Sequence, residues 1–283
     1  MLTIGDAVKL AVERLKDVSD TPSLDGRVLL KEVLKEDEVF LLTHRETILK
    51  DVEESDYLQK LALRERGMPI AYITGYKEFM GFRFKVNENT LIPRPDTEIA
   101  VETAIEAIKT KKYKKVLDLC SGSGAIGLSI AGILEFTNVT LSDINKGAIS
   151  VSKENAEQMD VTDRVKFIES DLFEKIEEKY DLIVSNPPYI NKDDMEVLSV
   201  SVKEYEPHLA LYGGMTGLDF YEKITKNVRE HLTENGMLIF EIGYDQSQEV
   251  ENMLKDNGFK NIITLKDLSG HHRVVSGELI PET

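Results

Sequence analysis

Four consecutive residues combine side chains that together can bind a planar NH2 group: Asn186, Pro187, Pro188 and Tyr189. We call them the NPPY turn. The asparagine oxygen and a carbonyl of the turn can each accept one hydrogen of such a group, and the tyrosine ring can stack on its face. The prolines fix φ and donate no N–H, so the carbonyls of the turn are free to face a ligand. Because such dipeptides also mark ordinary loops, the turn alone leaves both interpretations open.

The position of the NPPY turn favours a functional interpretation. It follows a short apolar run, residues 180–185, that is typical of a buried parallel strand. In open α/β sheets, ligands bind outside the carboxyl ends of the strands. The sequence therefore places the turn where a sheet of this kind binds its ligand.

A glycine-rich turn earlier in the chain predicts a nucleotide site. It follows a predicted strand at residues 115–119 and contains Gly122, Gly124 and Gly127 in the spacing of a dinucleotide fingerprint. Glycines let the main chain approach a ligand closely. Asp143 ends the next predicted strand about twenty residues on, where an acid binds ribose hydroxyls. This order suits NAD and also S-adenosylmethionine.

Two further acids favour S-adenosylmethionine over NAD. Asp118 ends the first strand, where it suits the cationic methionine end of S-adenosylmethionine and would repel an anionic pyrophosphate. Asp171 ends the third strand and offers an acceptor to the adenine amino group, with Leu172 and Phe173 as apolar flanks for the ring. We therefore expect a methyl donor rather than a dinucleotide.

Repeated strand and helix patterns must position these residues. From residue 115 onward, extended runs alternate with helical ones, which predicts a doubly wound α/β sheet. Strands are expected at residues 115–119, 139–144, 165–169, 181–185, 237–242, 262–265 and 273–279, and helices at 126–133, 148–159, 218–232 and 246–257. Since no helix joins the last two runs, the final strand is expected to enter antiparallel.

The N-terminal part of the chain has a different pattern. Residues 1–70 show helical apolar spacing that begins after Thr3, whose hydroxyl can cap a helix. Residues 69–86 alternate around glycines, as a β-hairpin does. We therefore divide the chain into a helical N-terminal domain (1–70), a linking β-hairpin (71–90) and a cofactor-binding domain (91–283).

Composition narrows the class of protein. The net charge of -16 argues against non-specific binding to nucleic acid or to an anionic membrane. The single cysteine, Cys120, cannot form an intrachain disulfide or a cysteine-based zinc cluster, and the histidines lack metal spacing, so we expect no metal. The chain shows no signal peptide and no apolar run that could span a bilayer, so we expect a cytoplasmic location.

Several longer motifs carry a resemblance to a known family. They are Pro69-Ile70-Ala71-Tyr72-Ile73-Thr74-Gly75, Glu78-Phe79-Met80-Gly81, residues 91–98 and 185–190, Glu206-Pro207 with Ala210-Leu211, and Phe240-Glu241-Ile242-Gly243. In order and spacing, over nearly the whole chain, they resemble the HemK/PrmC family, the glutamine methyltransferases of peptide chain release factors. The family implies a class I S-adenosylmethionine-dependent methyltransferase fold. That fold is α/β, with a doubly wound, mostly parallel seven-stranded sheet whose last strand is antiparallel, and here it carries a small N-terminal helical bundle and a linking β-hairpin.

The resemblance also implies a reaction and its residues. A class 1 release factor would be methylated on the side-chain amide nitrogen (N5) of the glutamine in its Gly-Gly-Gln motif, and S-adenosylmethionine would become S-adenosylhomocysteine. The expected catalytic and substrate-binding residues are those of the NPPY turn. The expected cofactor-binding residues, from the resemblance and the acids described above, are Asp118, Cys120, Ser121, Gly122, Ser123, Gly124, Asp143, Asp171, Leu172 and Asn186.

The sequence departs from the family pattern at two positions. Cys120 stands where a glycine is usual, which crowds the glycine-rich loop, and Leu172 stands where an aromatic residue is often found, which weakens the case for ring stacking.

Residues 93–98 are expected either to close over the cofactor or to begin a helix. Residues 191–214 are expected to form a mobile lid, a partner contact or a plain surface loop.

We predict that Asn186 and the Pro187 carbonyl accept the two N–H bonds of the glutamine amide and aim its nitrogen at the methyl group. We expect a monomer whose partner is the release factor, held by the N-terminal domain, without direct binding to nucleic acid or membrane. Three alternatives stay open. They are methylation of a ribosomal-protein glutamine, methylation of an exocyclic amine of nucleic acid, which the acidic charge disfavours, and a non-catalytic cofactor-binding assembly protein, which would not need the NPPY turn.

Overall fold

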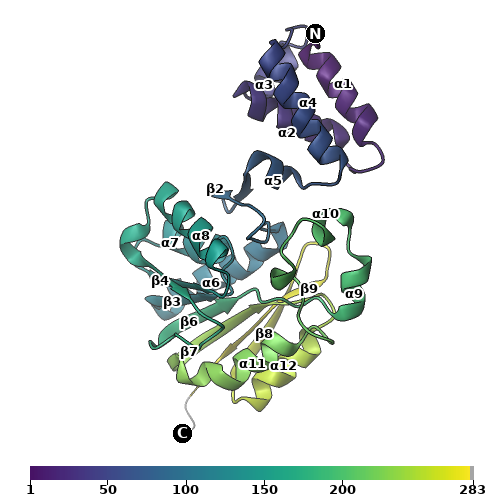
Figure 1. Ribbon diagram of the computed structural model, residues 1–283. Helices are drawn as coiled ribbons and strands as arrows, with labels where there is room; N and C mark the ends of the chain where they lie inside the picture. The colour runs from purple at the N-terminus through teal and green to yellow at the C-terminus, as the bar shows by residue number, and fades with distance from the viewer. Residues whose placement is uncertain (281–283) are drawn as a thin grey trace. The chain divides into compact units, whose positions relative to one another are not determined.

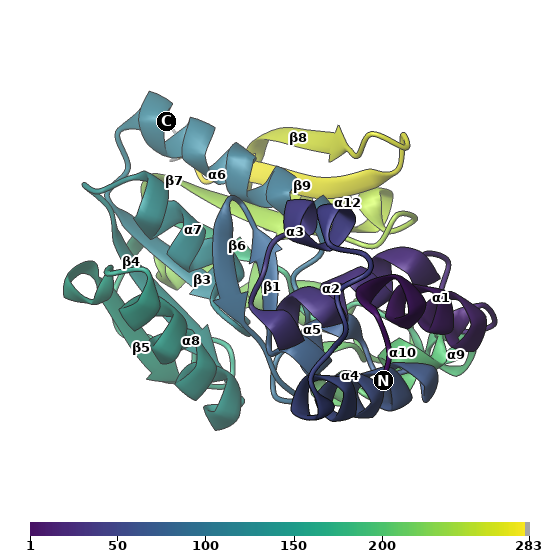
Figure 2. The ribbon, with the colours of Figure 1, turned by 90° about the horizontal axis from the view of Figure 1, so that it is seen from above.

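The computed structural model describes residues 1–280, which form two compact units (Figures 1 and 2). The first unit comprises Met1–Tyr76 together with Ser199–Tyr205, and the second comprises Lys77–Leu198 together with the chain from Glu206 onward. Within residues 1–280, none of the helices combines the length and the apolar character needed to cross a membrane.

A seven-stranded sheet forms the centre of the second unit. Its strand order is β5-β4-β3-β6-β7-β9-β8. The strands are β3 (Lys115–Leu119), β4 (Asn138–Asp143), β5 (Val165–Glu169), β6 (Tyr180–Ser185), β7 (Leu232–Glu241), β8 (Lys260–Lys266) and β9 (His272–Glu278). Strands β3 to β7 pair in parallel, whereas β9 runs antiparallel to both of its neighbours. The predicted doubly wound sheet with an antiparallel last strand is confirmed.

Helices cover both faces of this sheet (Figure 1). They are α6 (Glu98–Lys111), α7 (Ala125–Ile133) and α8 (Lys146–Gln158) on one face, and α11 (Asp219–Asn227) and α12 (Ser247–Asp256) on the other. Side chains alternate across a strand, so adjacent residues of β3 enter different apolar cores: Val116 packs with α6 and α7, and Leu117 packs with α11 and α12. Short 3-10 turns lie at Pro95–Thr97, Thr162–Arg164, His208–Ala210 and Val228–Glu230.

The first unit is a small helical bundle. Its helices are α1 (Ile4–Leu15), α2 (Pro22–Leu34), α3 (Glu38–Thr43), α4 (Asp51–Glu65), α5 (Ile70–Thr74) and α10 (Val200–Lys203). The Thr3 hydroxyl accepts a hydrogen bond from the Asp6 N–H at 3.1 Å, which confirms the predicted cap of α1. The core is apolar, with the Tyr57 hydroxyl satisfied by the Ala7 carbonyl at 2.9 Å.

The predicted hairpin begins later than expected. Its strands are β1 (Tyr76–Phe79) and β2 (Phe82–Lys85), whereas residues 70–74, which the alternation suggested were extended, form α5. Pro69 precedes this helix with a φ of -58°, and Gly75 ends it in the left-handed region at a φ of 83°. Proline is well suited to start a helix and glycine to end one, so these two residues override the strand-like alternation between them.

Candidate functional site

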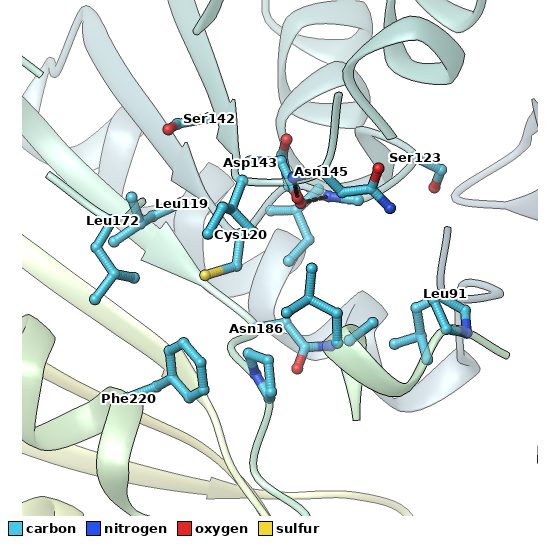
Figure 3. A pocket seen from close by; sticks show the side chains of 18 of the residues that line it. Leu91, Leu119, Cys120, Ser123, Ser142, Asp143, Asn145, Leu172, Asn186 and Phe220 are labelled. Atoms are coloured by element: carbon cyan, nitrogen blue, oxygen red, sulfur yellow. Dashed lines mark hydrogen bonds between the residues drawn. The ribbon is translucent and has the colours of Figure 1, made fainter. Parts of the chain in front are cut away.

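A cavity of about 290 Å³ lies at the carboxyl ends of the parallel strands (Figure 3). It brings together most of the predicted site residues: Cys120, Ser121, Gly122, Ser123, Asp143, Asp171, Leu172, Asn186 and Pro188. Among the described residues, four others that the sequence predicted are not part of the lining: Asp118, Gly124, Pro187 and Tyr189. The size and mixed polarity of the cavity suit a small organic ligand.

The loop between β3 and α7, residues 120–124, forms one wall of the cavity and is called the glycine loop. Gly122 has a φ of 55°, and a Cβ placed on it would meet no atom within 4 Å, so its missing side chain leaves open space in front of the main chain. A Cβ on Gly124 would lie 2.7 Å from Leu141. Gly122 therefore makes room for a ligand, whereas Gly124 lets the loop pack on the sheet.

The backbone conformation at Cys120 accounts for the glycine that is usual at this position in the family. Its φ is 62°, in the left-handed region that glycine adopts without strain, so the usual glycine at this position has a conformational reason. The thiol lines the cavity, and burial raises its pKa. Leu172 also has a positive φ, 45°, and lies with Phe220 on the side of the cavity away from Leu91 (Figure 3). Phe220 thus brings to this wall an aromatic ring that the sequence did not predict.

Asp143, at the end of β4, joins the glycine loop to the next turn. Its Oδ2 accepts the Gly122 N–H at 2.8 Å, and its Oδ1 accepts the Asn145 N–H at 2.8 Å. Burial raises the pKa of this carboxyl, and these main-chain hydrogen bonds oppose the rise. Each oxygen retains acceptor capacity, so the carboxylate can still bind a pair of ligand hydroxyls.

Asp118 supports the first turn of α7, directly after the glycine loop. Because side chains alternate along β3, Leu119 faces the cavity and Asp118 faces α7, where its Oδ2 accepts the Gly127 N–H at 2.8 Å. Its Oδ1 is buried without a hydrogen-bond partner among the described residues, and burial raises the pKa of the carboxyl to about 7. The Asp118 side chain thus contacts the first turn of α7 and does not line the cavity. The alternation of side chains along β3 could have predicted that Asp118 and Leu119 face opposite sides of the sheet.

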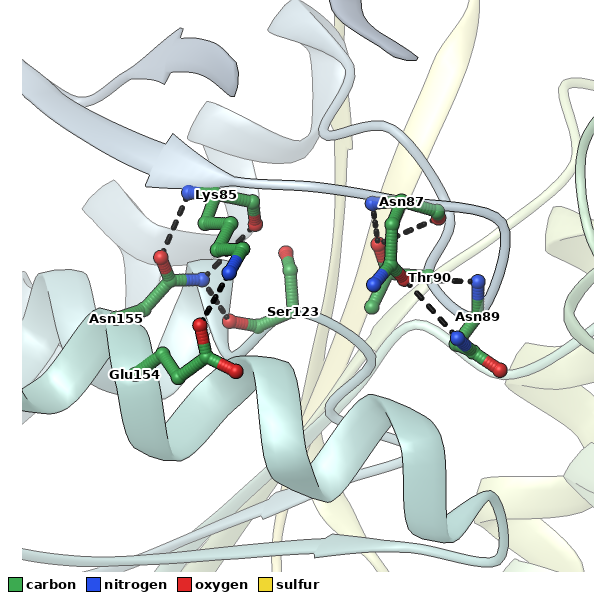
Figure 4. A network of polar contacts seen from close by, with 7 residues as sticks. All are labelled: Lys85, Asn87, Asn89, Thr90, Ser123, Glu154 and Asn155. Atoms are coloured by element: carbon green, nitrogen blue, oxygen red, sulfur yellow. Dashed lines mark hydrogen bonds and ion pairs between the residues drawn. The ribbon is translucent and has the colours of Figure 1, made fainter. Parts of the chain in front are cut away.

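Asn155 of α8 provides a second support that the sequence did not reveal (Figure 4). Its side-chain NH2 donates to the Ser123 carbonyl at 2.9 Å and to the Lys85 carbonyl at 3.1 Å, and its oxygen accepts the Lys85 N–H at 2.6 Å. The residue is fully buried. One side chain thus connects the hairpin strand β2 to the glycine loop.

The NPPY turn is held on its outer side. Gly213 lies so close that a Cβ there would come within 2.6 Å of the Pro188 carbonyl, and Ile190 exchanges main-chain hydrogen bonds of 2.9 Å with Leu211 and Gly213. The Tyr189 carbonyl accepts from the Gln246 side chain at 3.0 Å. Asn186 and Pro188 line the cavity, whereas Tyr189 packs partly against the apolar core under α11 and α12.

Glu206 connects the two segments that cover the cavity. Its buried carboxylate accepts the Ile92 N–H at 3.2 Å and forms an ion pair with Arg94. Pro93 and Pro207, beside these residues, both line the cavity. Glu98 instead accepts the Met80 N–H at 3.0 Å, so it holds the hairpin turn. Residues 191–214 contain α9 (Lys192–Val197), α10 and a 3-10 turn rather than a structureless loop.

Glu241 is a further residue near the site; it belongs to the motif Phe240-Glu241-Ile242-Gly243, but no role in the site was predicted for it. It ends β7 next to the NPPY turn and is 2% exposed. Burial raises the pKa of its carboxyl to about 7, and the nearby side chains of Thr97 and Asn186 oppose this rise. The motif marked the residue, but its position beside Asn186 follows only from the pairing of β6 with β7.

The lining of the cavity fits S-adenosylmethionine. The open space at Gly122 leaves the main chain accessible, Asp143 can accept from ribose hydroxyls, and Asp171 can accept from the adenine amino group. The apolar side chains at the same wall, Leu172 and Phe220, suit the flat face of the adenine ring. Among residues 1–280, no group of histidine, cysteine and acidic side chains could hold a metal ion.

Comparison with known proteins gives the same assignment. Family models match at residues 95–216, "Methyltransferase small domain", and at residues 6–75, "PrmC N-terminal domain". A release factor glutamine methyltransferase of Clostridium acetobutylicum is 46% identical over 97% of this chain and 98% of its own. A release factor glutamine methyltransferase of Clostridium botulinum is 48% identical over 89% of this chain and 90% of its own. The hMettl16 catalytic domain, solved with an RNA hairpin, shares the fold, with a TM-score of 0.58 and 14% identity over 82% of this chain and 84% of its own.

Proposed function

The chain belongs to the HemK/PrmC family of release factor glutamine methyltransferases, and we propose that its substrate is the Gly-Gly-Gln glutamine of a class 1 release factor. The methyl group would be added to the side-chain amide nitrogen. The observation that carries this proposal is the placement of Asn186 and Pro188 on the same cavity as Gly122 and Asp143. The proposed cofactor pocket and the proposed acceptor for an NH2 group would thus share one cavity.

The proposed role of the NPPY turn follows from the chemistry of an amide. An amide nitrogen is a poor nucleophile because its lone pair is delocalised into the carbonyl, so the site must orient it. Asn186 Oδ1 and the Pro187 carbonyl would accept its two N–H bonds and aim the nitrogen, and Tyr189 would stack on the amide face. S-adenosylmethionine supplies an electrophilic methyl group. The proton released from the amide nitrogen passes to water.

The proposed cofactor-binding residues divide by role. Gly122, with Cys120, Ser121 and Ser123 around it, presents main chain to the methionine portion, Asp143 binds the ribose, and Asp171 with Leu172 binds adenine. Asp118 and Gly124 would act through the position of the glycine loop rather than by direct contact. Asn186 would border both cofactor and substrate.

We further propose that residues 1–70 dock the release factor, that residues 71–90 link this domain to the methyltransferase domain 91–283, and that the protein acts as a cytoplasmic monomer. Exposed apolar side chains support the docking role: Val39 is 65% exposed, Leu42 is 60% exposed and Val52 is 80% exposed. Such residues suit a protein contact. Deleting residues 1–70 is expected to weaken binding of the intact release factor while leaving cofactor affinity unchanged.

The proposal is tested by offering several substrates. The protein is incubated with labelled S-adenosylmethionine and purified release factor, ribosomal protein or DNA, and mass spectrometry locates the label. Methylation of the Gly-Gly-Gln glutamine supports the proposal. Label on a ribosomal protein or DNA alone would support the alternative substrates, and cofactor binding without label on any of them would favour a non-catalytic protein.

A further inference from the structure

Asn186 and Glu241 occupy adjacent positions on neighbouring parallel strands. Ser185 of β6 pairs with Phe240 of β7, so the next residues along the two strands, Asn186 and Glu241, lie side by side where the strands end. Asn186 borders the cavity, whereas Glu241 is only 2% exposed. The carboxylate therefore lies behind the asparagine as seen from the cavity.

Within residues 1–280, no basic side chain forms an ion pair with the Glu241 carboxylate. Its Oε2 is buried without a hydrogen-bond partner among the described residues, and the nearby polar side chains that lower the pKa of the carboxyl are those of Thr97 and Asn186. Arg273 contributes positive charge, but its Nε pairs with Asp96 at 3.1 Å and with Asp267 at 2.9 Å. Burying a carboxylate in this way is costly, which points to a function for it.

A carboxylate at this place resolves an ambiguity in the asparagine. The two ends of an Asn side chain have nearly the same shape, but one is an acceptor and the other a donor. An ionised carboxylate only accepts, so it selects the rotamer in which the Asn186 NH2 faces Glu241. The Asn186 oxygen is then left toward the cavity, where the proposed substrate amide needs an acceptor.

We propose that Glu241 is a positioning residue that fixes the Asn186 amide with its oxygen toward the substrate. This inference rests on the proposed function, because it assigns the cavity side of Asn186 to a substrate NH2 group. Thr97, at the start of α6, lowers the pKa of the same carboxyl, and the Tyr221 hydroxyl donates to the Glu241 main-chain carbonyl at 3.0 Å. The main chain of the glutamate is thus held by α11.

Protonation of Glu241 would reverse the preference. A carboxylic acid can donate a hydrogen bond to the Asn186 oxygen, so the amide can turn and present its NH2 group to the substrate. Because the substrate NH2 is also a donor, the two groups cannot form a hydrogen bond. The pKa of Glu241 is raised to about 7 by burial, against the effects of Thr97, Arg273 and Asn186, with Asp96 adding to the rise. Tyr189 and Tyr221 interact electrostatically with this carboxylate, and burial raises the pKa of both phenols, which keeps them neutral. The orienting effect is therefore present at alkaline pH and lost as the pH falls through 7.

The variant Glu241→Gln tests this role, with Glu178→Gln as a control for loss of one surface carboxylate. Glutamine keeps the shape but can offer either end to Asn186. We expect kcat for release factor methylation to fall about tenfold, because a charge-assisted hydrogen bond is replaced by a neutral one, while KM and the S-adenosylmethionine Kd stay within about threefold. The rise of kcat between pH 6 and 8 should disappear in this variant and persist in Glu178→Gln. A variant with wild-type kcat and pH profile would overturn the proposal.

A measurement on the wild-type protein covers the case in which Glu241→Gln does not fold. The side-chain NH2 signals of Asn186, identified in a ¹⁵N-labelled protein by their loss in Asn186→Ala, should shift between pH 6 and 8 if Glu241 is their partner. Signals that stay constant over this range would overturn the proposal. Absence of release factor methylation by the wild type would instead refute the proposed function, and the titration would still decide the contact between Asn186 and Glu241.

Discussion

Asp143 Oδ2 accepts the main-chain N–H of Gly122 at 2.8 Å, so the carboxylate proposed to bind the ribose also holds the glycine loop. The two roles are compatible because a carboxylate oxygen accepts more than one hydrogen bond. The end of β4 and the loop after β3 are thereby fixed relative to each other before any ligand binds.

Asp143→Ala should therefore weaken binding of S-adenosylmethionine at least tenfold. Hydrogen bonds to charged groups contribute about 1.5–3 kcal/mol each, and the variant loses those to the ligand as well as the support of Gly122. Calorimetry measures the Kd, with Asp163→Ala as the control because the Asp163 side chain is 76% exposed. A Kd equal to that of the wild type would refute the ribose assignment.

Asn155→Ala should destabilise the second unit. The substitution removes three hydrogen bonds at a fully buried position and leaves the Ser123 carbonyl without this donor. Each bond contributes about 0.5–1.5 kcal/mol, so we expect the free energy of unfolding to fall by about 2–4 kcal/mol in urea titrations. Gln158→Ala, which removes one exposed hydrogen bond to the Arg83 carbonyl, should cost less than about 1 kcal/mol. Equal effects of the two variants would contradict the supporting role of Asn155.

Asp118 should make the protein less stable as the pH rises toward 7. The pKa of an aspartate carboxyl in the unfolded chain is 3.8, and that of Asp118 in the folded protein is about 7. Between these two pH values, the folded state therefore binds more protons than the unfolded state. The free energy of unfolding then decreases with pH, by at most about 1.4 kcal/mol per pH unit from this group. Glu241, also raised to about 7, acts in the same direction.

Asp118→Asn should remove part of this slope when unfolding is measured at pH 5, 6, 7 and 8. Glu178 does not interfere, because its pKa is lowered to about 2 by Lys115 and Lys166, and its contribution is lost only in more acidic solution. A slope identical to that of the wild type would show that Asp118 is not buried in the way described.

The sequence predicted the parts of the site that depend on local patterns. Short continuous apolar runs and glycine spacing located the parallel strands and the glycine loop, and acids at strand ends located Asp143 and Asp171. The signals were local because a parallel strand followed by a ligand-binding turn is itself a local motif. The alternation of residue types around glycines was misleading at residues 70–74, which form a helix that follows Pro69 and ends at Gly75.

The remaining parts depend on contacts between distant segments. Glu206 bonds to Ile92 across 114 residues of sequence, and Asn155 bonds to Lys85 across 70. A single buried polar residue in a helix or loop has no periodicity that marks it. The orientation of Asn186 by Glu241 likewise requires the register of β6 and β7, which no local pattern contains.

The central claim is that Asn186 orients the substrate amide nitrogen, and single-turnover methyl transfer by Asn186→Ala tests it most directly. The reaction uses saturating S-adenosylmethionine and purified release factor, with the product located on the glutamine by mass spectrometry and the cofactor Kd measured in parallel. We predict a rate about a hundredfold or more below that of the wild type, because misplacement of a reacting group by about 1 Å has an effect of this size, with retained cofactor binding. A near wild-type rate in a variant that binds the cofactor would contradict the account.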